Sequence, residues 1–116
     1  MKKYTIILAM LFFGFTASNF FANGVKVFKS KCGHCHALTF DGKKVTHGSI
    51  GANLTGVAQK YPEDFIKMYM TNPVKARKKF AKICSKLLKK CGKSGVKMPA
   101  IPVRENQVNA IYEILK

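Results

Sequence analysis

Residues Cys32-Gly33-His34-Cys35-His36 form a Cys-x-x-Cys-His run, and the rest of the 116-residue chain can be understood by its relation to this run. Two cysteines three positions apart lie on one turn of a helix, so both thiols reach the same ligand. Each thiol can add to one of the two vinyl groups of a haem, and the histidine that follows then faces the iron. The run therefore predicts one covalently attached haem c, with Cys32 and Cys35 as thioether anchors and His36 as an axial iron ligand.

Two other kinds of site contain a similar pair of cysteines. A redox-active dithiol uses Cys-x-x-Cys but has no need of His36. A zinc site needs a fourth ligand to complete a tetrahedron. Haem attachment is the preferred interpretation, because an export signal precedes the run and covalent haem attachment requires such a compartment. His34, between the anchors, is interpreted as a partly solvated side chain that points away from the iron.

The N-terminus has the pattern of a secretory signal, with two lysines, an apolar stretch, and then small and polar residues. The apolar stretch is too short to span a bilayer comfortably. Cleavage is predicted after Ala22, with a cut after Ala17 or Ser18 as the alternative. Residues 1–22 are thus the expected signal peptide and 23–116 the mature domain. The expected location is the periplasm; an uncleaved signal that anchors the protein in the membrane is the less favoured alternative.

The mature chain is strongly basic. The formal charge is +16, and the predicted signal peptide contains two lysines and no acid, which leaves +14 over 94 residues. Such a balance favours acidic protein surfaces or anionic lipid headgroups as partners. No nucleic acid is expected as a partner, because the protein is predicted to be exported and the sequence shows neither a helix-turn-helix signal nor an aromatic-basic stacking motif.

A resemblance to class I cytochromes c becomes specific just before the Cys-x-x-Cys-His run. Gly24, then Phe28 four positions later, then the first cysteine four positions after that, are spaced as in the N-terminal helix of that family. In that family the helix packs across the C-terminal helix, and the glycine allows close backbone approach. Residues 103–116 have apolar positions at helical period and are expected to form this partner helix. The resemblance implies an all-α, class I cytochrome c fold with crossing N- and C-terminal helices around one covalently bound haem.

The stretch 37–60 is rich in glycine and turn signals and is expected to be loop. Within it, Gly51-Ala52-Asn53-Leu54 resembles the family's Gly-Pro-x-Leu turn, whose second residue offers its backbone carbonyl to the axial histidine. The resemblance gives this role to Ala52, although the family usually has proline there. Such an acceptor fixes the histidine ring and raises its basicity as a ligand. His47, in the same stretch, is interpreted as a surface residue rather than an iron ligand.

The segment from Pro62 is expected to form a helix that ends before Pro73, because a residue that precedes proline is pushed out of the helical region. Its last residues resemble the family's Tyr-x-x-Asn-Pro pattern. In that pattern the tyrosine hydroxyl lies near the axial methionine, and the asparagine helps to hold the methionine loop. The resemblance therefore implies that Tyr69 and Asn72 lie in the surroundings of the haem.

Met98-Pro99 stands shortly before the last helix, where the family has its second iron ligand. Met98 is therefore the expected axial ligand opposite the histidine. A soft thioether in that position stabilises ferrous iron and raises the reduction potential. Met68 and Met70 are the alternatives, but they lie in a helix whose apolar residues are needed for the core.

The chain departs from the family at residues 73–97, a basic insertion with ten lysines and arginines and no acid. Apolar residues at spacings of three and four indicate an amphipathic helix, with Gly92 as its C-cap. Cys84 and Cys91 are predicted to form a disulfide, because the compartment is oxidising. This pairing requires a break in the helix after Leu87, since an intact helix would hold the two Cα atoms about 10.5 Å apart, and a disulfide bridges at most roughly 7 Å.

These features predict a periplasmic single-haem c-type cytochrome that carries one electron by cycling between Fe(III) and Fe(II), and not an enzyme, since no nucleophile–base pair is visible. Two alternatives stay open. One is a haem subunit of a larger periplasmic oxidoreductase, and the other is a ligand-binding haem sensor or enzyme in which Met98 does not bind the iron. The expected partner is an acidic redox protein, a membrane terminal oxidase or a periplasmic reductase, with membrane-surface association as a further alternative.

Overall fold

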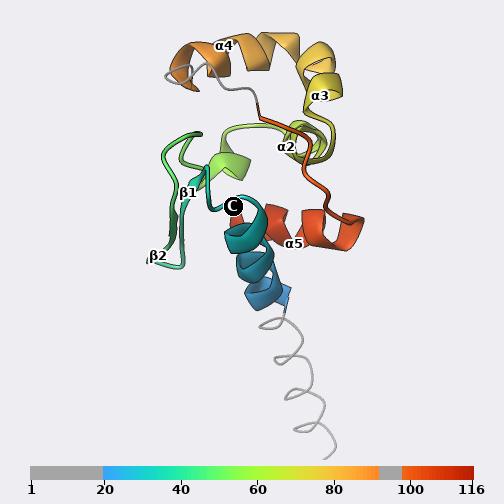
Figure 1. Ribbon diagram of the computed structural model, residues 1–116. Helices are drawn as coiled ribbons and strands as arrows, with labels where there is room; N and C mark the ends of the chain where they lie inside the picture. The colour runs from blue at the N-terminus through green and yellow to red at the C-terminus, as the bar shows by residue number, and fades with distance from the viewer. Residues whose placement is uncertain (1–19, 92–97) are drawn as a thin grey trace, which may run out of the picture.

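A computed structural model of the chain describes residues 20–91 and 98–116, with only the backbone for 87–91. The described part is mostly helical (Figure 1). The first helix covers residues 20–31. The elements that follow are β1 (Ala37–Phe40), β2 (Lys43–His47), the short η1 (Val57–Gln59), α2 (Glu63–Thr71), α3 (Pro73–Lys79), α4 (Ala81–Cys91) and α5 (Glu105–Ile114).

The predicted signal peptide, residues 1–22, lies outside the described residues except for its last three, which belong to the first helix. Gly92, the predicted C-cap, also lies outside them. In the ranges that are described, none of the helices is long and apolar enough to cross a lipid bilayer.

The first helix and α5 pack closely at Gly24. A Cβ atom added there would lie 2.5 Å from the carbonyl oxygen of Ala110, so no side chain fits without moving one of the helices. Phe28, one turn further along the first helix, is completely buried, as are Ala110 and nearly all of Ile111. The predicted contact between the terminal helices, through Gly24 and Phe28, is confirmed.

A β-hairpin occupies part of the segment that the sequence predicts to be loop. β1 and β2 pair antiparallel, with an irregularity between Leu38 and Thr39. The turn between them is Asp41-Gly42, and both residues have positive φ, 52° and 71°. A two-residue turn of this kind matches the twist of the two strands, and Asp-Gly is one of its strongest sequence signals. The loop prediction is wrong for residues 37–47, because the Asp-Gly turn signal here joins two paired strands.

The helices α2 and α3 meet at a sharp boundary. Two acids, Glu63 and Asp64, open α2 and complement its positive end. Asn72 leaves the helical conformation, with φ −145° and ψ 78°, and its side-chain oxygen accepts a hydrogen bond from the backbone N–H of Lys75 at 3.1 Å. Because Pro73 follows as the first residue of α3, the pair Asn72-Pro73 ends one helix and caps the next.

The predicted disulfide is not formed. Cys84 is a free thiol and is 4% exposed, and α4 continues without a break through the second cysteine of the pair. The interruption lies earlier, at Phe80, whose backbone is non-helical at φ −115° and ψ 45°. The ring of Phe80 packs edge-on against Phe65 of α2, with 5.5 Å between centroids. The helical spacing of the apolar residues therefore predicts the structure of this segment better than the argument from an oxidising compartment does.

The contact at Gly24 gives a test in which two effects have opposite signs. Helix propensity alone predicts that Gly24→Ala stabilises the protein by about 1 kcal/mol. Because the methyl group would meet the Ala110 carbonyl, we expect instead that the free energy of unfolding falls by roughly 1–3 kcal/mol. Urea unfolding of the haem-loaded protein measures it. Asn23→Ala, at the exposed neighbouring position, is the control and should change stability by no more than about 0.5 kcal/mol.

Candidate haem-attachment site

The Cys-x-x-Cys-His run forms one tight turn at the end of the first helix. The backbone N–H groups of Cys32 and Gly33 both donate to the carbonyl of Phe28 at 2.8 Å, and the N–H of His36 donates to the carbonyl of Cys32 at 2.9 Å. The two cysteines and the histidine are thus held within one turn of chain, directly after the residue that anchors the helix in the core.

The imidazole of His36 is held from one side. Its Nδ1 lies 2.8 Å from the carbonyl oxygen of Ala52, and because a carbonyl only accepts hydrogen bonds, Nδ1 carries the proton. The other nitrogen, Nε2, then has its lone pair free for a metal ion. The hydrogen bond expected from the family turn is present although Ala52 replaces proline. Gly51 makes room for the ring, since a Cβ atom there would collide with the imidazole.

The hairpin and the segment after it also make hydrogen bonds to the Cys-x-x-Cys-His turn. The hydroxyl of Thr46, on β2, donates to the carbonyl of His36 at 2.7 Å, and the N–H of Gly51 donates to the carbonyl of Cys35 at 2.7 Å. A Cβ atom on Gly48 would lie 2.5 Å from the backbone of Cys35 and His36. Sequence reasoning did not single out Thr46 or Gly48, because these contacts depend on the register of a hairpin that was not predicted.

The environment of Cys32 does not favour a redox dithiol. Burial raises the pKa of Cys32 to about 11; the neighbouring Cys35 adds to the rise, and Lys31 opposes it. The attacking thiol of a redox-active pair has a lowered pKa instead. Throughout residues 20–86 and 98–116, no cluster of three or more His, Cys, Asp or Glu is arranged to hold a metal ion. The structure therefore offers no support for the zinc alternative there.

The other predicted site residues lie in different surroundings. Tyr69 is half-buried, with its ring 5.5 Å from that of Phe65. Asn72 is exposed and caps α3, so its observed role is to begin a helix. His47 is exposed at the end of β2, as expected. Met98 is half-buried in the segment that leads into α5, and its role as an iron ligand stays a prediction.

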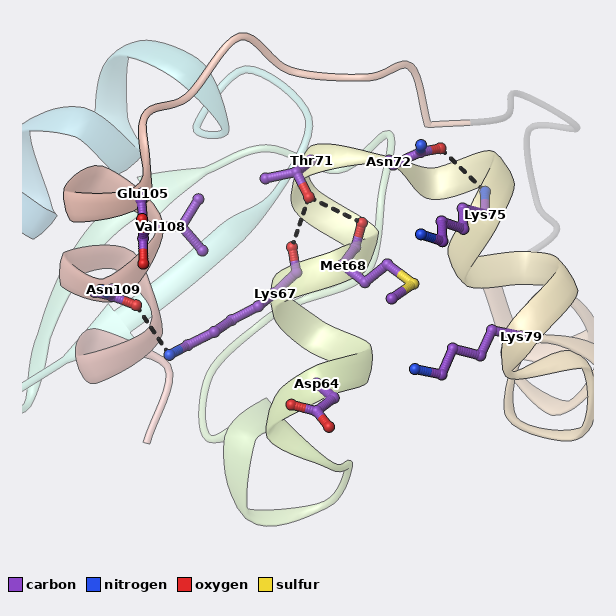
Figure 2. Close-up of a pocket in the computed structure, with 10 residues that line it drawn as sticks. All are labelled: Asp64, Lys67, Met68, Thr71, Asn72, Lys75, Lys79, Glu105, Val108 and Asn109. Atoms are coloured by element: carbon purple, nitrogen blue, oxygen red, sulfur yellow. Dashed lines mark hydrogen bonds between the residues drawn. The ribbon is translucent and has the colours of Figure 1, made fainter.

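Met68 and Met70 both lie on α2, but their side chains have different surroundings. Met70 is 8% exposed and belongs to the buried core. Met68 instead lines an open groove of about 680 Å³ between α2, α3 and α5 (Figure 2), whose lining residues are Asp64, Lys67, Met68, Thr71, Asn72, Lys75, Lys79, Glu105, Val108 and Asn109. This groove contains none of the three residues of the haem motif, so it is separate from the attachment turn.

One lysine of this groove, Lys67, already has partners within the chain. The ammonium of Lys67 lies 2.6 Å from the carboxylate of Glu63 and donates to the side chain of Asn109 at 2.9 Å. The same ammonium lies 5.0 Å from the ring centre of Tyr112 on α5. The contacts with Asn109 and Tyr112 tie α2 to α5 and explain the lysine as structural.

Comparison with known proteins agrees with the fold. The sequence profile of the cytochrome c family matches residues 21–113, so the chain belongs to the cytochrome c family. Its fold is similar to that of a solved structure described as cytochrome c from Rhodothermus marinus, with a TM-score of 0.64 and 23% identity over 84% of this chain and 75% of that one. Among curated proteins, no significant match was found.

Membership of the family implies a covalent haem c and haem-based electron transfer, and family members are typically electron carriers rather than enzymes. The residues of this chain fit that group. The attachment cysteines Cys32 and Cys35 are both free thiols, and the His36 ring is oriented by Ala52 so that Nε2 is the atom left for iron.

The close approach of Gly51 to the imidazole can be tested directly. In Gly51→Ala the new methyl group would overlap the His36 ring, so the ring or the turn must move. We expect the haem absorption spectrum to change and the free energy of unfolding to fall by about 1–3 kcal/mol. Ser49→Ala, at an exposed position of the same segment, should change neither. A Gly51→Ala protein with the spectrum and stability of the wild type would show that the ring does not need this space.

Proposed function

We propose that this protein is a periplasmic single-haem cytochrome that carries one electron between redox partners. The observation that supports it most is the hydrogen bond from His36 Nδ1 to the Ala52 carbonyl within a Cys-x-x-Cys-His turn. This bond leaves Nε2 as an iron ligand and makes it more basic. The periplasmic location rests on the N-terminal sequence, with an uncleaved membrane anchor as the less favoured alternative.

Haem c, when bound, supplies an iron that gains and loses one electron. Cys32 and Cys35 would hold the macrocycle through thioether bonds, and His36 and Met98 would hold the iron. With imidazole on one side and a thioether on the other, both axial positions are filled, and the reduced form is favoured. The buried surroundings of Cys32, Phe28 and Leu38 keep water from that side of the attachment turn. No substrate has to bind for such a carrier to work.

The basic insertion supports an acidic redox protein as the partner. Neither α3 nor α4 contains an acid, and within residues 73–86, where the side chains are described, five lysines are exposed: Lys75, Lys78, Lys79, Lys82 and Lys86. Charge gathered on one arm attracts an oppositely charged surface at a distance and raises the rate of association more than the affinity. A membrane terminal oxidase or a periplasmic reductase with an acidic docking face fits the same proposal.

The assignment of Met98 separates the electron carrier from a ligand-binding haem protein. Because Met98 is proposed as the second axial ligand, Met98→Ala should open the iron to carbon monoxide and lower the reduction potential. The wild-type reduced protein should bind carbon monoxide only slowly at neutral pH. Prompt binding by the wild type would favour the sensor or enzyme alternative.

Met68→Ala and Met70→Ala are the matched controls. Neither should change carbon monoxide binding, although Met70→Ala should cost about 2–5 kcal/mol of stability because Met70 is buried. If Met70→Ala opens the iron and Met98→Ala does not, the ligand assignment is wrong.

The docking role of the insertion predicts a strong dependence on salt. The Debye length is about 8 Å at physiological ionic strength, so added salt should steeply slow electron transfer to an acidic partner. Lys78→Glu with Lys82→Glu should slow the reaction at low salt, whereas Lys44→Glu, on the hairpin, should do so much less. Stopped-flow rates that stay level from low to high salt would contradict the docking role.

A further inference from the structure

Arg77, on α3, has a buried side-chain nitrogen without a partner. Its Nη1 is enclosed, and among the residues that the structure describes no acceptor lies within hydrogen-bonding distance of it. No other buried side-chain nitrogen or oxygen in the described ranges is left in this way. A guanidinium keeps its charge in proteins, and a buried charge without a counter-charge is strongly unfavourable. The atom therefore points to an anion.

No side-chain carboxylate among the described residues pairs with Arg77. The chain contains only five acids, and all of them lie in the described residues: Asp41, Glu63, Asp64, Glu105 and Glu113. Glu63 and Glu113 pair with Lys67 and Lys116, and no salt bridge within those residues involves Arg77. The counter-anion must therefore come from outside the polypeptide side chains.

The surroundings of Arg77 connect it with the buried core to which the first haem anchor also belongs. Its neighbour Ala76 is completely buried, so this part of α3 faces the interior. Arg77 also lies near Cys84, because its charge opposes the rise that burial causes in the pKa of that thiol. Cys84 belongs to the same contiguous buried cluster as Cys32, the first haem anchor. The buried end of Arg77 is thus on the inner side of the α3–α4 arm.

We infer that Arg77 binds a propionate carboxylate of the covalently attached haem, an inference that rests on the proposed function because only the bound haem supplies this anion. Haem carries two propionates, and the planar guanidinium can donate two parallel hydrogen bonds to one carboxylate. The inward Arg77 and the outward lysines then divide the basic insertion into two roles. The arginine binds the cofactor, and the lysines remain for the partner.

The test compares two neighbouring positions on α3. Arg77→Gln removes a cation whose Nη1 is buried, and Lys78→Gln removes an exposed one. Ferric haem carries one more positive charge than ferrous haem, so a nearby cation disfavours the ferric form. We therefore expect Arg77→Gln to lower the reduction potential and to make it depend on pH where the propionate titrates. Lys78→Gln should shift the potential much less, because water screens its charge. Arg77→Lys, which keeps the cation, should recover most of the potential.

A spectroscopic measurement on the propionates decides whether Arg77 binds one of them or has only a structural role. Resonance Raman propionate bending bands of the wild-type protein should show one hydrogen-bonded carboxylate, and Arg77→Gln should remove that signature. Two free propionates in the wild type would overturn the inference even if the variant does not accumulate. Equal potential shifts in Arg77→Gln and Lys78→Gln would also overturn it. A pyridine haemochrome assay distinguishes failure of the proposed function from failure of the Arg77 inference. Absence of covalent haem in the wild type rejects both. A haem-loaded protein with free propionates rejects only the role of Arg77.

Discussion

The hydrogen bond between His36 and Ala52 is the interaction on which the arrangement of the site depends. Two segments sixteen positions apart meet at 2.8 Å, and the approach is possible because Gly51 has no side chain to meet the ring. This single bond sets which nitrogen is protonated, and therefore which nitrogen is left for iron. The hairpin and its following segment serve the same end, since Thr46 holds the carbonyl of the histidine at 2.7 Å. The His36 ring and its backbone are thus held by backbone carbonyl and hydroxyl groups, and none of these contacts depends on a charged residue.

The turn can be held in this way only because the helix before it is fixed. Phe28 is buried and accepts, through its carbonyl, the hydrogen bonds that begin the turn, while Gly24 lets the same helix lie against Ala110 of α5. The first and last helices therefore form a base for the haem motif, as Figure 1 shows at the point where the teal helix meets α5. The hydrogen bond from Lys67 of α2 to Asn109 of α5 adds a further contact to this base. Substitutions at the helix crossing should reach the site through the position of Phe28.

The features that could be predicted from sequence are those set by short, local patterns. The spacing of Gly24, Phe28 and Cys32 located the first helix and its partner, and the Gly51-Ala52 turn located the acceptor of the histidine proton. The hairpin was missed because Asp41-Gly42 has two meanings, a break in a helix or a turn between strands, and the flanking strands are short. The predicted disulfide at Cys84 failed because it relied on the compartment, whereas the continuous helix forbids the geometry. Thr46 had no signal at all, since its contact needs a hairpin register with an irregularity in it.

The basic insertion shows why the number of basic residues in a segment does not tell how many of them are exposed at the surface. All ten of its basic residues resemble a solvated face when the period of the apolar residues is considered alone. In the structure Arg77 differs from its neighbours: it follows the fully buried Ala76, and its Nη1 is enclosed. An arginine can occupy such a position because its long apolar stem covers surface while its planar head forms paired hydrogen bonds. Lysine at the same place would offer a compact, strongly hydrated charge. The one arginine of this insertion is therefore the residue whose chemistry suits an interior anion, and the lysines around it suit the solvent.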